Sequence, residues 1–254
     1  MCNLVFIDNP IYVHPVDVTK ITEDIEKMDI SSNNKDEALS DDFNYDKTVL
    51  SIDIGIHHLG LSVGLIDKAW NLLEITWVNL INITEYSHNL VCEEECKLQH
   101  GRCVADWLEH VFQEYEPVFR EVDYILLERQ PLQGLVAIEQ VIYYRWRFKC
   151  SLVSPRSMHK HFMIGYYDYE RRKEKTVQIA SKVFWNDRAI EYYKKCTRQH
   201  DIADSICLMM YWLKKHHDTY VLKKLKDDVS RIKMTSHGFN SIDDWFAQFR
   251  YVAY

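Results

Sequence analysis

Four acidic residues stand in apolar surroundings, where a carboxylate is costly unless something neutralises it. Asp53 lies inside the run LSIDIG, Glu128 ends the run YILLE, and Asp201 and Asp204 lie three residues apart in HDIADSICLMMYW, on one helix face. An unpaired buried carboxylate either destabilises the fold or takes up a proton. Clustered carboxylates are the usual ligands of Mg²⁺ or Mn²⁺ in proteins. These four residues are therefore candidate metal ligands and candidate catalytic residues.

Carboxylate-held metal ions suit the hydrolysis of a phosphodiester. The reaction needs an activated water, a neutralised phosphate and a stabilised leaving oxygen, and two metal ions roughly 3.5–4 Å apart supply all three. In that arrangement Asp53 would bridge both ions, Glu128 would hold one, and Asp201 and Asp204 the other. His200 could orient the water or protonate the leaving oxygen, but it fits equally well as a helix-entry residue. Each acid alone also has a structural explanation, as a turn cap or as part of a helix start.

The elements that must position these acids form a sheet with helices on both faces. Short apolar or alternating runs predict strands at residues 48–55, 59–67, 72–84, 122–128 and 150–153. Helical periodicity predicts helices at residues 102–115, 135–148, 169–185 and 199–212. This order predicts an α/β protein with the ribonuclease H-like fold, a mixed five-stranded sheet of three antiparallel strands followed by two parallel ones. In that fold the first and fourth strands are neighbours, so the acids should converge at one edge of the sheet.

Composition limits the class of protein. The 254 residues are 47% hydrophobic and 27% charged, a globular balance, and no apolar run is long enough for a membrane span. Asp8 and the prolines at positions 10 and 15 interrupt any signal-peptide core. The seven scattered cysteines indicate reduced thiols in a cytosolic or nuclear compartment. Secreted and membrane classes are therefore excluded.

Charge is distributed unevenly along the chain. Residues 1–46 carry 3 basic and 11 acidic side chains, so we expect a largely flexible acidic N-terminal extension there. Residues 141–233 carry 21 Lys and Arg against 10 Asp and Glu. Such a surplus is typical of a face that binds a polyanion, although a solvated helix surface gives the same pattern.

Six segments carry a resemblance to one family of DNA enzymes. They are SIDIGIHHLGLSVG, ILLERQPLQG, AIEQVIYY, LVSPRSMHKHF, YERRKEKTVQIA and HDIADSICLMMYW. In this order, over roughly residues 48–212, the chain resembles the Holliday junction resolvases of poxviruses and other large cytoplasmic DNA viruses, which are relatives of the bacterial RuvC-type resolvases. The resemblance places a RuvC-like nuclease domain at residues 47–216 and leaves a C-terminal helical extension at residues 217–254.

The resemblance implies a homodimeric, Mg²⁺-dependent endonuclease, with Mn²⁺ as a substitute, that nicks four-way DNA junctions symmetrically. It would process viral replication and recombination intermediates in the host cytoplasm or nucleus. By position, the family's four metal-binding acids correspond to Asp53, Glu128, Asp201 and Asp204. The helix bearing Glu139 and Gln140 corresponds to the one that packs across the family's dimer axis.

Basic side chains near the acids in this layout are candidate DNA contacts. Phosphate contacts position a duplex without reading its sequence and make binding salt-dependent. For the segment YERRKEK a solvated helix face is the alternative. The neighbouring aromatics Tyr143, Tyr144 and Trp146 have helical spacing, which favours core or dimer packing over insertion into a junction. The candidate contacts are Arg145, Arg147, Lys149, Arg156, Lys160, Arg171, Arg172, Lys173 and Lys175.

The segment CEEECKLQHGRC places Cys92, Cys96, His100 and Cys103 within 12 residues. These are zinc-type ligands, but their spacing matches none of the common structural zinc patterns. A continuous helix would also spread them into a stripe. A structural zinc ion is therefore not the favoured interpretation.

Two other functions are compatible with the same residues. Another ribonuclease H-like nuclease, acting on flaps or RNA–DNA hybrids, would need the same catalytic core. A junction-binding scaffold without catalysis would not, and the intact set of four acids argues against it. No membrane partner is expected.

Overall fold

The structure is a computed structural model in which residues 46–87, 96, 98, 101 and 103–233 are described. Residues 1–45 of the predicted acidic extension lie outside the described residues. The predicted C-terminal extension at 217–254 is described as far as Lys233.

Five strands form one mixed sheet in the order β3-β2-β1-β4-β5. β1 pairs antiparallel with β2 and β2 with β3, whereas β1 pairs in parallel with β4 and β4 with β5. The predicted topology is therefore confirmed, with strand ends within about two residues of those predicted. The strands are β1 (Lys47–Ile54), β2 (His58–Ile66), β3 (Leu72–Asn82), β4 (Tyr124–Glu128) and β5 (Cys150–Val153).

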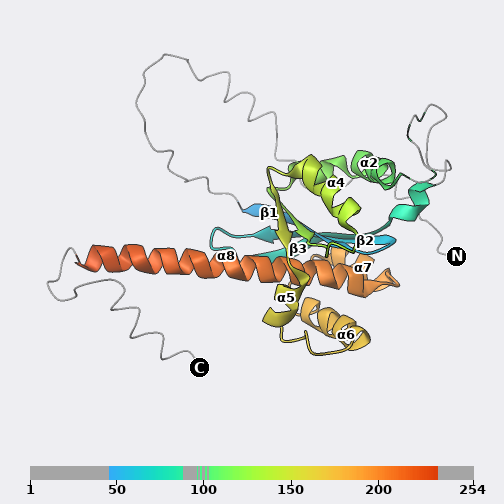
Figure 1. Ribbon diagram of the computed structural model, residues 1–254. Helices are drawn as coiled ribbons and strands as arrows, with labels where there is room; N and C mark the ends of the chain where they lie inside the picture. Colours follow the sequence, from blue (N-terminus) through green and yellow to red (C-terminus); the bar gives the residue numbers. More distant parts are fainter. Residues whose placement is uncertain (1–45, 88–95, 97, 99–100, 102, 234–254) are drawn as a thin grey trace, which may run out of the picture. The chain divides into compact units, whose positions relative to one another are not determined.

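Helices cover both faces of the sheet (Figure 1). One face carries α2 (Val104–Glu114), α3 (Glu116–Glu121) and α4 (Val136–Trp146). The other carries α5 (Pro155–His161), α6 (Tyr169–Ala180), α7 (Asp187–Lys195) and α8 (Gln199–Lys233). A short 3₁₀ helix, η1 (Ile83–Ser87), follows β3.

Side-chain alternation divides the core into two layers. On β1, Val49 is buried in the layer shared with α8, and Leu50 is buried in the layer under α4. On β4, Leu126 belongs to the α8 layer and Leu127 to the other. Because successive side chains of a strand point to opposite faces, odd positions of β1 and even positions of β4 face α8.

α8 packs closely on β2 because the strand presents small residues to it. Gly60, Ser62 and Gly64 share the face toward α8, and Ser205 Oγ of the helix donates to Ser62 Oγ at 2.9 Å. Within residues 199–227 of the helix, Leu213 is the last buried residue, and the helix continues to Lys233. It is therefore much longer than the predicted 199–212.

Three of the described α-helices, α3, α5 and α7, were not predicted, and the last two begin at capping residues that the sequence displays. Ser154 caps α5 by accepting a hydrogen bond from the N–H of Ser157, and Pro155 occupies the first turn. Asn186 caps α7 by accepting from two main-chain N–H groups. The prediction of a single helix at 169–185 was wrong, since α6 ends at Ala180. Among the described residues, no helix combines the length and apolar character needed to cross a membrane.

Candidate active site

Asp53 and Glu128 lie side by side where two parallel strands end. The register of β1 and β4 brings the two residues together, and both occupy positions that face α8. The N–H of Ile54 donates to Glu128 Oε2 at 3.2 Å, and Gln130 Nε2 donates to the same oxygen at 2.8 Å. These bonds hold the Glu128 carboxylate beside Asp53.

Asp201 and Asp204 lie on the first turns of α8 and are 4% and 9% exposed. Their approach to the sheet depends on Gly60, which pairs with Asp53 across β1 and β2. A Cβ atom on Gly60 would lie 2.2 Å from the main-chain oxygen of Asp201. The absence of a side chain at this position therefore lets α8 bring its two carboxylates next to Asp53.

The ammonium group of Lys173 lies among these acids. Its Nζ is 2.5 Å from Asp204 Oδ2 and 3.4 Å from Asp201 Oδ1, and the side chain is 17% exposed. Arg198, just before α8, places its Nε 2.6 Å from Asp201 Oδ2. The two aspartates of α8 are therefore ion-paired to one residue on α6 and one in the preceding loop.

Burial and mutual repulsion disturb the ionisation of the carboxyl groups on the strands. Burial raises the pKa of Asp53 well above its usual value, and the charges of Glu128 and Asp204 raise it further against the opposing effect of Lys173. Burial likewise raises the pKa of Glu128, although its hydrogen bonds act in the opposite direction. At Asp201 burial is outweighed by Arg198 and Lys173, and the pKa is lowered.

The donor set suits a divalent cation. Carboxylate oxygens are the ligands that Mg²⁺ and Mn²⁺ prefer, and a cation would relieve the repulsion that raises the pKa of Asp53. Among the described residues, no three Asp, Glu, His or Cys side chains are already grouped as ligands of one ion. The Lys173 ammonium supplies positive charge between the two aspartates of α8 instead.

The four acids open onto one cleft of about 450 Å³. His200, predicted either to act on water or to begin a helix, lies with its Nε2 3.1 Å from Asp201 Oδ1 and is not among the cleft-lining residues. Besides the acids, the cleft is lined by residues 54–58, Leu135, Pro155, Met158, His159, Tyr169, Arg172, Lys173, Arg198 and Leu208.

Two of the predicted DNA contacts, Arg172 and Lys173, line the cleft itself. Arg172 Nη1 donates to the main-chain oxygen of Tyr167 at 2.7 Å, which fixes the guanidinium at the cleft wall. Lys173 lies in the acid cluster and not on an outer face.

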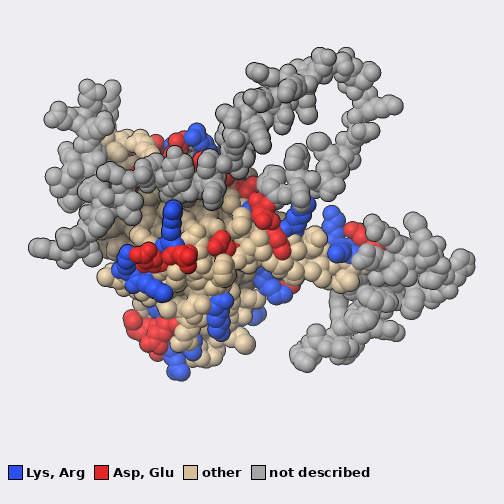
Figure 2. Space-filling model, turned by 180° about the vertical axis from the view of Figure 1, so that it is seen from behind, with Lys and Arg blue, Asp and Glu red and all other residues tan. Residues whose placement is uncertain are grey.

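The other predicted DNA contacts have separate surroundings. Arg145 pairs with Glu109 at 2.7 Å, and Lys149 Nζ donates to two main-chain carbonyls, so both have intramolecular partners. On the face shown in Figure 2, lysine and arginine side chains are interspersed with acidic ones and form no continuous basic patch. The remaining candidates, all exposed or partly exposed, are Arg147, Arg156, Lys160, Arg171 and Lys175.

Several cleft residues were not singled out from the sequence, among them Arg198, His58 and His159. Arg198 lies in the loop just before α8, three residues before Asp201. His58 is the first residue of β2, the strand directly after the one that carries Asp53, and His159 lies in the segment LVSPRSMHKHF, one of the six that resemble the resolvases. The available signal was proximity to a candidate acid or motif, which many surface residues share.

The cysteine cluster is only partly described. Cys92 and His100 lie outside the described residues. Cys96 Sγ lies 3.5 Å from Nε2 of His110, a residue of α2, and Cys103 is the residue before that helix. No zinc-binding group is found in the described part of the chain.

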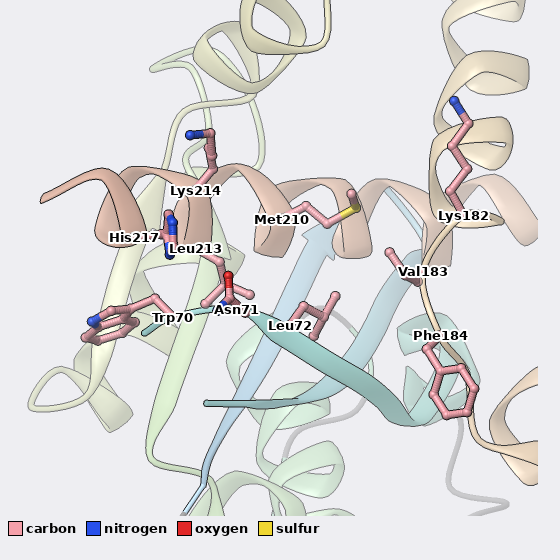
Figure 3. Close-up of a pocket in the computed structure, with 10 residues that line it drawn as sticks. All are labelled: Trp70, Asn71, Leu72, Lys182, Val183, Phe184, Met210, Leu213, Lys214 and His217. Atoms are coloured by element: carbon pink, nitrogen blue, oxygen red, sulfur yellow. The ribbon is translucent and has the colours of Figure 1, made fainter. Parts of the chain in front are cut away.

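A second cavity of about 520 Å³ lies at the opposite end of β1 from the acids. Figure 3 shows it between the β2–β3 turn, residues 182–184 and α8, with Trp70 and Phe184 at its two ends. Lys182, Lys214 and His217 are its polar members besides Asn71, and none of its lining residues is acidic. This second cavity therefore contains none of the four candidate catalytic acids.

Solved structures with a similar fold are resolvases. The yeast mitochondrial Holliday junction resolvase Ydc2 is 18% identical with a TM-score of 0.50, over 76% of this chain and 89% of that one. The fowlpox virus resolvase, solved with its substrate Holliday junction DNA, is 17% identical with a TM-score of 0.47, over 66% and 97%. Thermus thermophilus RuvC is 10% identical with a TM-score of 0.41, over 66% and 96%. The first likeness confirms the predicted RuvC-like fold.

Sequence comparison gives the family. No curated protein matches the chain. The model of a family described as Poxvirus A22 protein matches residues 47–216, a range that includes all four acids. Since this match spans two thirds of its length, the chain belongs to the Poxvirus A22 protein family.

Proposed function

We propose that this protein is an endonuclease that resolves four-way (Holliday) DNA junctions of a viral genome by divalent-metal-dependent hydrolysis. The observation that carries the proposal is the convergence of Asp53, Glu128, Asp201 and Asp204 on one cleft. Membership of the Poxvirus A22 family and the fold shared with a mitochondrial Holliday junction resolvase support the junction as substrate.

The four acids would hold the metal together, but their surroundings affect their ionisation differently. Asp53 and Glu128 on the strands and Asp201 and Asp204 on α8 would hold Mg²⁺, which supplies an activated water and neutralises charge on the phosphate. Burial and the charges of the neighbouring carboxylates raise the pKa of Asp53, so a bound cation would favour its ionised form. Asp201 is kept ionised by Arg198 and Lys173 and needs no such help.

Basic side chains prepare the cleft for a polyanion. Arg172 of α6 and Arg198, just before α8, both line it, and each is fixed by a hydrogen bond, to the main chain of Tyr167 and to Asp201. Lys173 offsets the repulsion between the acids and an incoming phosphate, because its ammonium lies at the two aspartates of α8. A phosphodiester can therefore approach a site that holds four carboxylates.

Symmetric cutting needs two active sites, so we infer a homodimer formed through α4. The helix exposes Gln140 and Tyr144 along one face, and Tyr144 and Phe148 are 75% and 93% exposed. The Arg147 guanidinium lies 5.5 Å from the ring centroid of Tyr144 and 5.0 Å from that of Phe148. Exposed Tyr and Arg beside a helix face are typical of protein–protein interfaces.

Glu139 of the same helix is buried and does not belong to this surface. Its carboxylate accepts a hydrogen bond from the N–H of Gln130, the residue whose side chain donates to Glu128 in the active site.

Cleavage of a labelled four-way junction beside linear duplex, flap and RNA–DNA hybrid tests the proposal. Paired symmetric nicks in the junction alone, dependent on Mg²⁺, are expected. Preferential cutting of the flap or hybrid would support the active site but show that the four-way junction is not the substrate, and tight junction binding without cutting would favour a scaffold.

Sedimentation tests the proposed dimer. It should give a species near twice 30.4 kDa, and a monomer that stays monomeric on DNA would contradict the dimer.

A further inference from the structure

His159 lies in the wall of the cleft formed by α5. It lines the cleft together with Pro155 and Met158 of the same short helix, and α5 packs on α8. The main chain of His159 is held in place because its carbonyl accepts from the N–H of Ile164, a residue that is only 2% exposed. The imidazole is therefore carried by a fixed segment and not by a surface loop.

The imidazole of His159 makes no hydrogen bond within the described part of the chain, unlike the cations around it. Lys173 is bound to the aspartates of α8, Arg198 to Asp201, and Arg172 to a main-chain oxygen. The half-buried histidine thus faces the cleft with its hydrogen-bonding capacity unused.

Burial and the neighbouring cations disfavour the protonated form of His159. Burial lowers its pKa, the neighbouring Arg172 and Lys173 of α6 lower it further, and Asp204 of α8 acts in the opposite direction. A neutral imidazole presents one N–H donor and adds no charge to a cleft whose cations are already paired. A donor of this kind suits a phosphate oxygen that gains negative charge as water attacks.

We propose that His159 donates an N–H to a non-bridging oxygen of the phosphodiester being cut, from the α5 side of the cleft. The inference rests on the proposed nuclease function and adds a substrate contact to it. No proton is transferred by the imidazole in this role. Its contribution is a positioned hydrogen bond that strengthens as the oxygen becomes more negative, which speeds the chemical step more than it strengthens DNA binding.

Single-turnover cleavage of a four-way junction in Mg²⁺, with junction affinity measured in Ca²⁺, tests the contact. His159→Ala should slow cleavage on the order of 100-fold, the usual loss for one transition-state donor, and change affinity by less than about threefold. His159→Gln keeps an N–H donor and should recover most of the rate, whereas His159→Phe keeps the ring shape and should not. His161→Ala is the matched control, since His161 lies on the same helix, is exposed and does not line the cleft.

The glutamine and phenylalanine variants separate a substrate contact from a packing role. Cleavage by His159→Ala at the wild-type rate would overturn the inference, and so would full activity of His159→Phe or equal losses in the alanine and glutamine variants. If the wild-type protein cuts a flap or hybrid in place of the junction, the proposed function is wrong. The cleavage rates of the His159 variants relative to the wild-type protein are then measured on that substrate, and they still test the His159 contact. A wild-type protein that cuts nothing overturns both.

Discussion

Replacing Gly60 with alanine changes the contact on which the placement of two acids depends. The added Cβ would lie 2.2 Å from the main-chain oxygen and 2.5 Å from the carbonyl carbon of Asp201, and 3.0 Å from the N of Ile202. All three atoms belong to the backbone of α8, so no side-chain rotation can relieve the clash. The first turn of the helix must therefore move away from β2 by about 1 Å or more.

The expected cost follows from that displacement. Overpacking in a well-packed core costs typically 1–3 kcal/mol, and a backbone clash belongs near the upper end, so we expect about 2–3 kcal/mol. For a domain of this size that lowers Tm by roughly 5–10 °C. Because Asp201 and Asp204 move with the helix while Asp53 stays on β1, cleavage should also slow by about 100-fold.

Gly64→Ala is the matched control. Gly64 lies on the same strand and the same face, but a Cβ there would meet the ends of the flexible side chains of Met209 and Leu72, at 2.5 and 2.7 Å. These side chains can adopt other rotamers, so the loss of stability should be smaller and the cleavage rate unchanged. Urea unfolding and single-turnover junction cleavage on both variants give the comparison.

The two variants must differ for the reasoning to stand. A Gly60→Ala protein with wild-type stability and rate would show that α8 does not rest on Gly60 as described. Equal losses of rate in both variants would show that packing anywhere along β2, and not the position of the α8 acids, controls activity.

Three further predictions concern separate parts of the molecule. Lys173→Met leaves the two aspartates of α8 without their ammonium partner, so the free energy of unfolding in urea without Mg²⁺ should fall by on the order of 3 kcal/mol, and Mg²⁺ should restore part of it. Lys175→Met removes only a hydrogen bond to a neighbour on the same helix and should change the free energy of unfolding little. Equal losses in the two variants would contradict the role of Lys173. Tyr144→Ala combined with Phe148→Ala should weaken the dimer at least tenfold in sedimentation, and an unchanged dimer would exclude this face of α4. Burial raises the pKa of Cys150 to about 12, so little of the reactive thiolate forms at pH 8. Alkylation of Cys150, followed by mass spectrometry, should therefore be at least about 100-fold slower in the folded protein than in urea. Equal alkylation rates would contradict the burial of this thiol.

The sheet and the acidic residues could be predicted from the sequence because both follow from local patterns. A carboxylate inside an apolar strand, as at Asp53, is conspicuous on its own. The structure confirms the predicted strand order, although it contains helices between and after the strands that were not predicted. Whether the four acids act as assigned stays a prediction, although the structure brings them to one cleft.

The remaining features depend on packing that no local pattern reveals. α8 continues past Leu213 to Lys233 along a polar sequence, and its residues 214–227 include none of the buried positions by which an amphipathic helix is recognised. Lys173 belongs to a basic run that looks like a DNA-binding surface, and only the contact between α6 and α8 turns it toward the acids. Arg198 likewise becomes part of the site through the fold.

The central claim is that four carboxylates held by β1, β4 and α8 hydrolyse the strands of a four-way junction with the help of a divalent cation. Wild-type protein and Asp53→Asn should be compared on one labelled junction, with Mg²⁺ and with EDTA, and with binding measured in Ca²⁺. Paired symmetric nicks by the wild-type protein in Mg²⁺ alone, and none by Asp53→Asn despite equally tight binding, are predicted. Cleavage retained by Asp53→Asn, or cleavage in EDTA, would contradict the account.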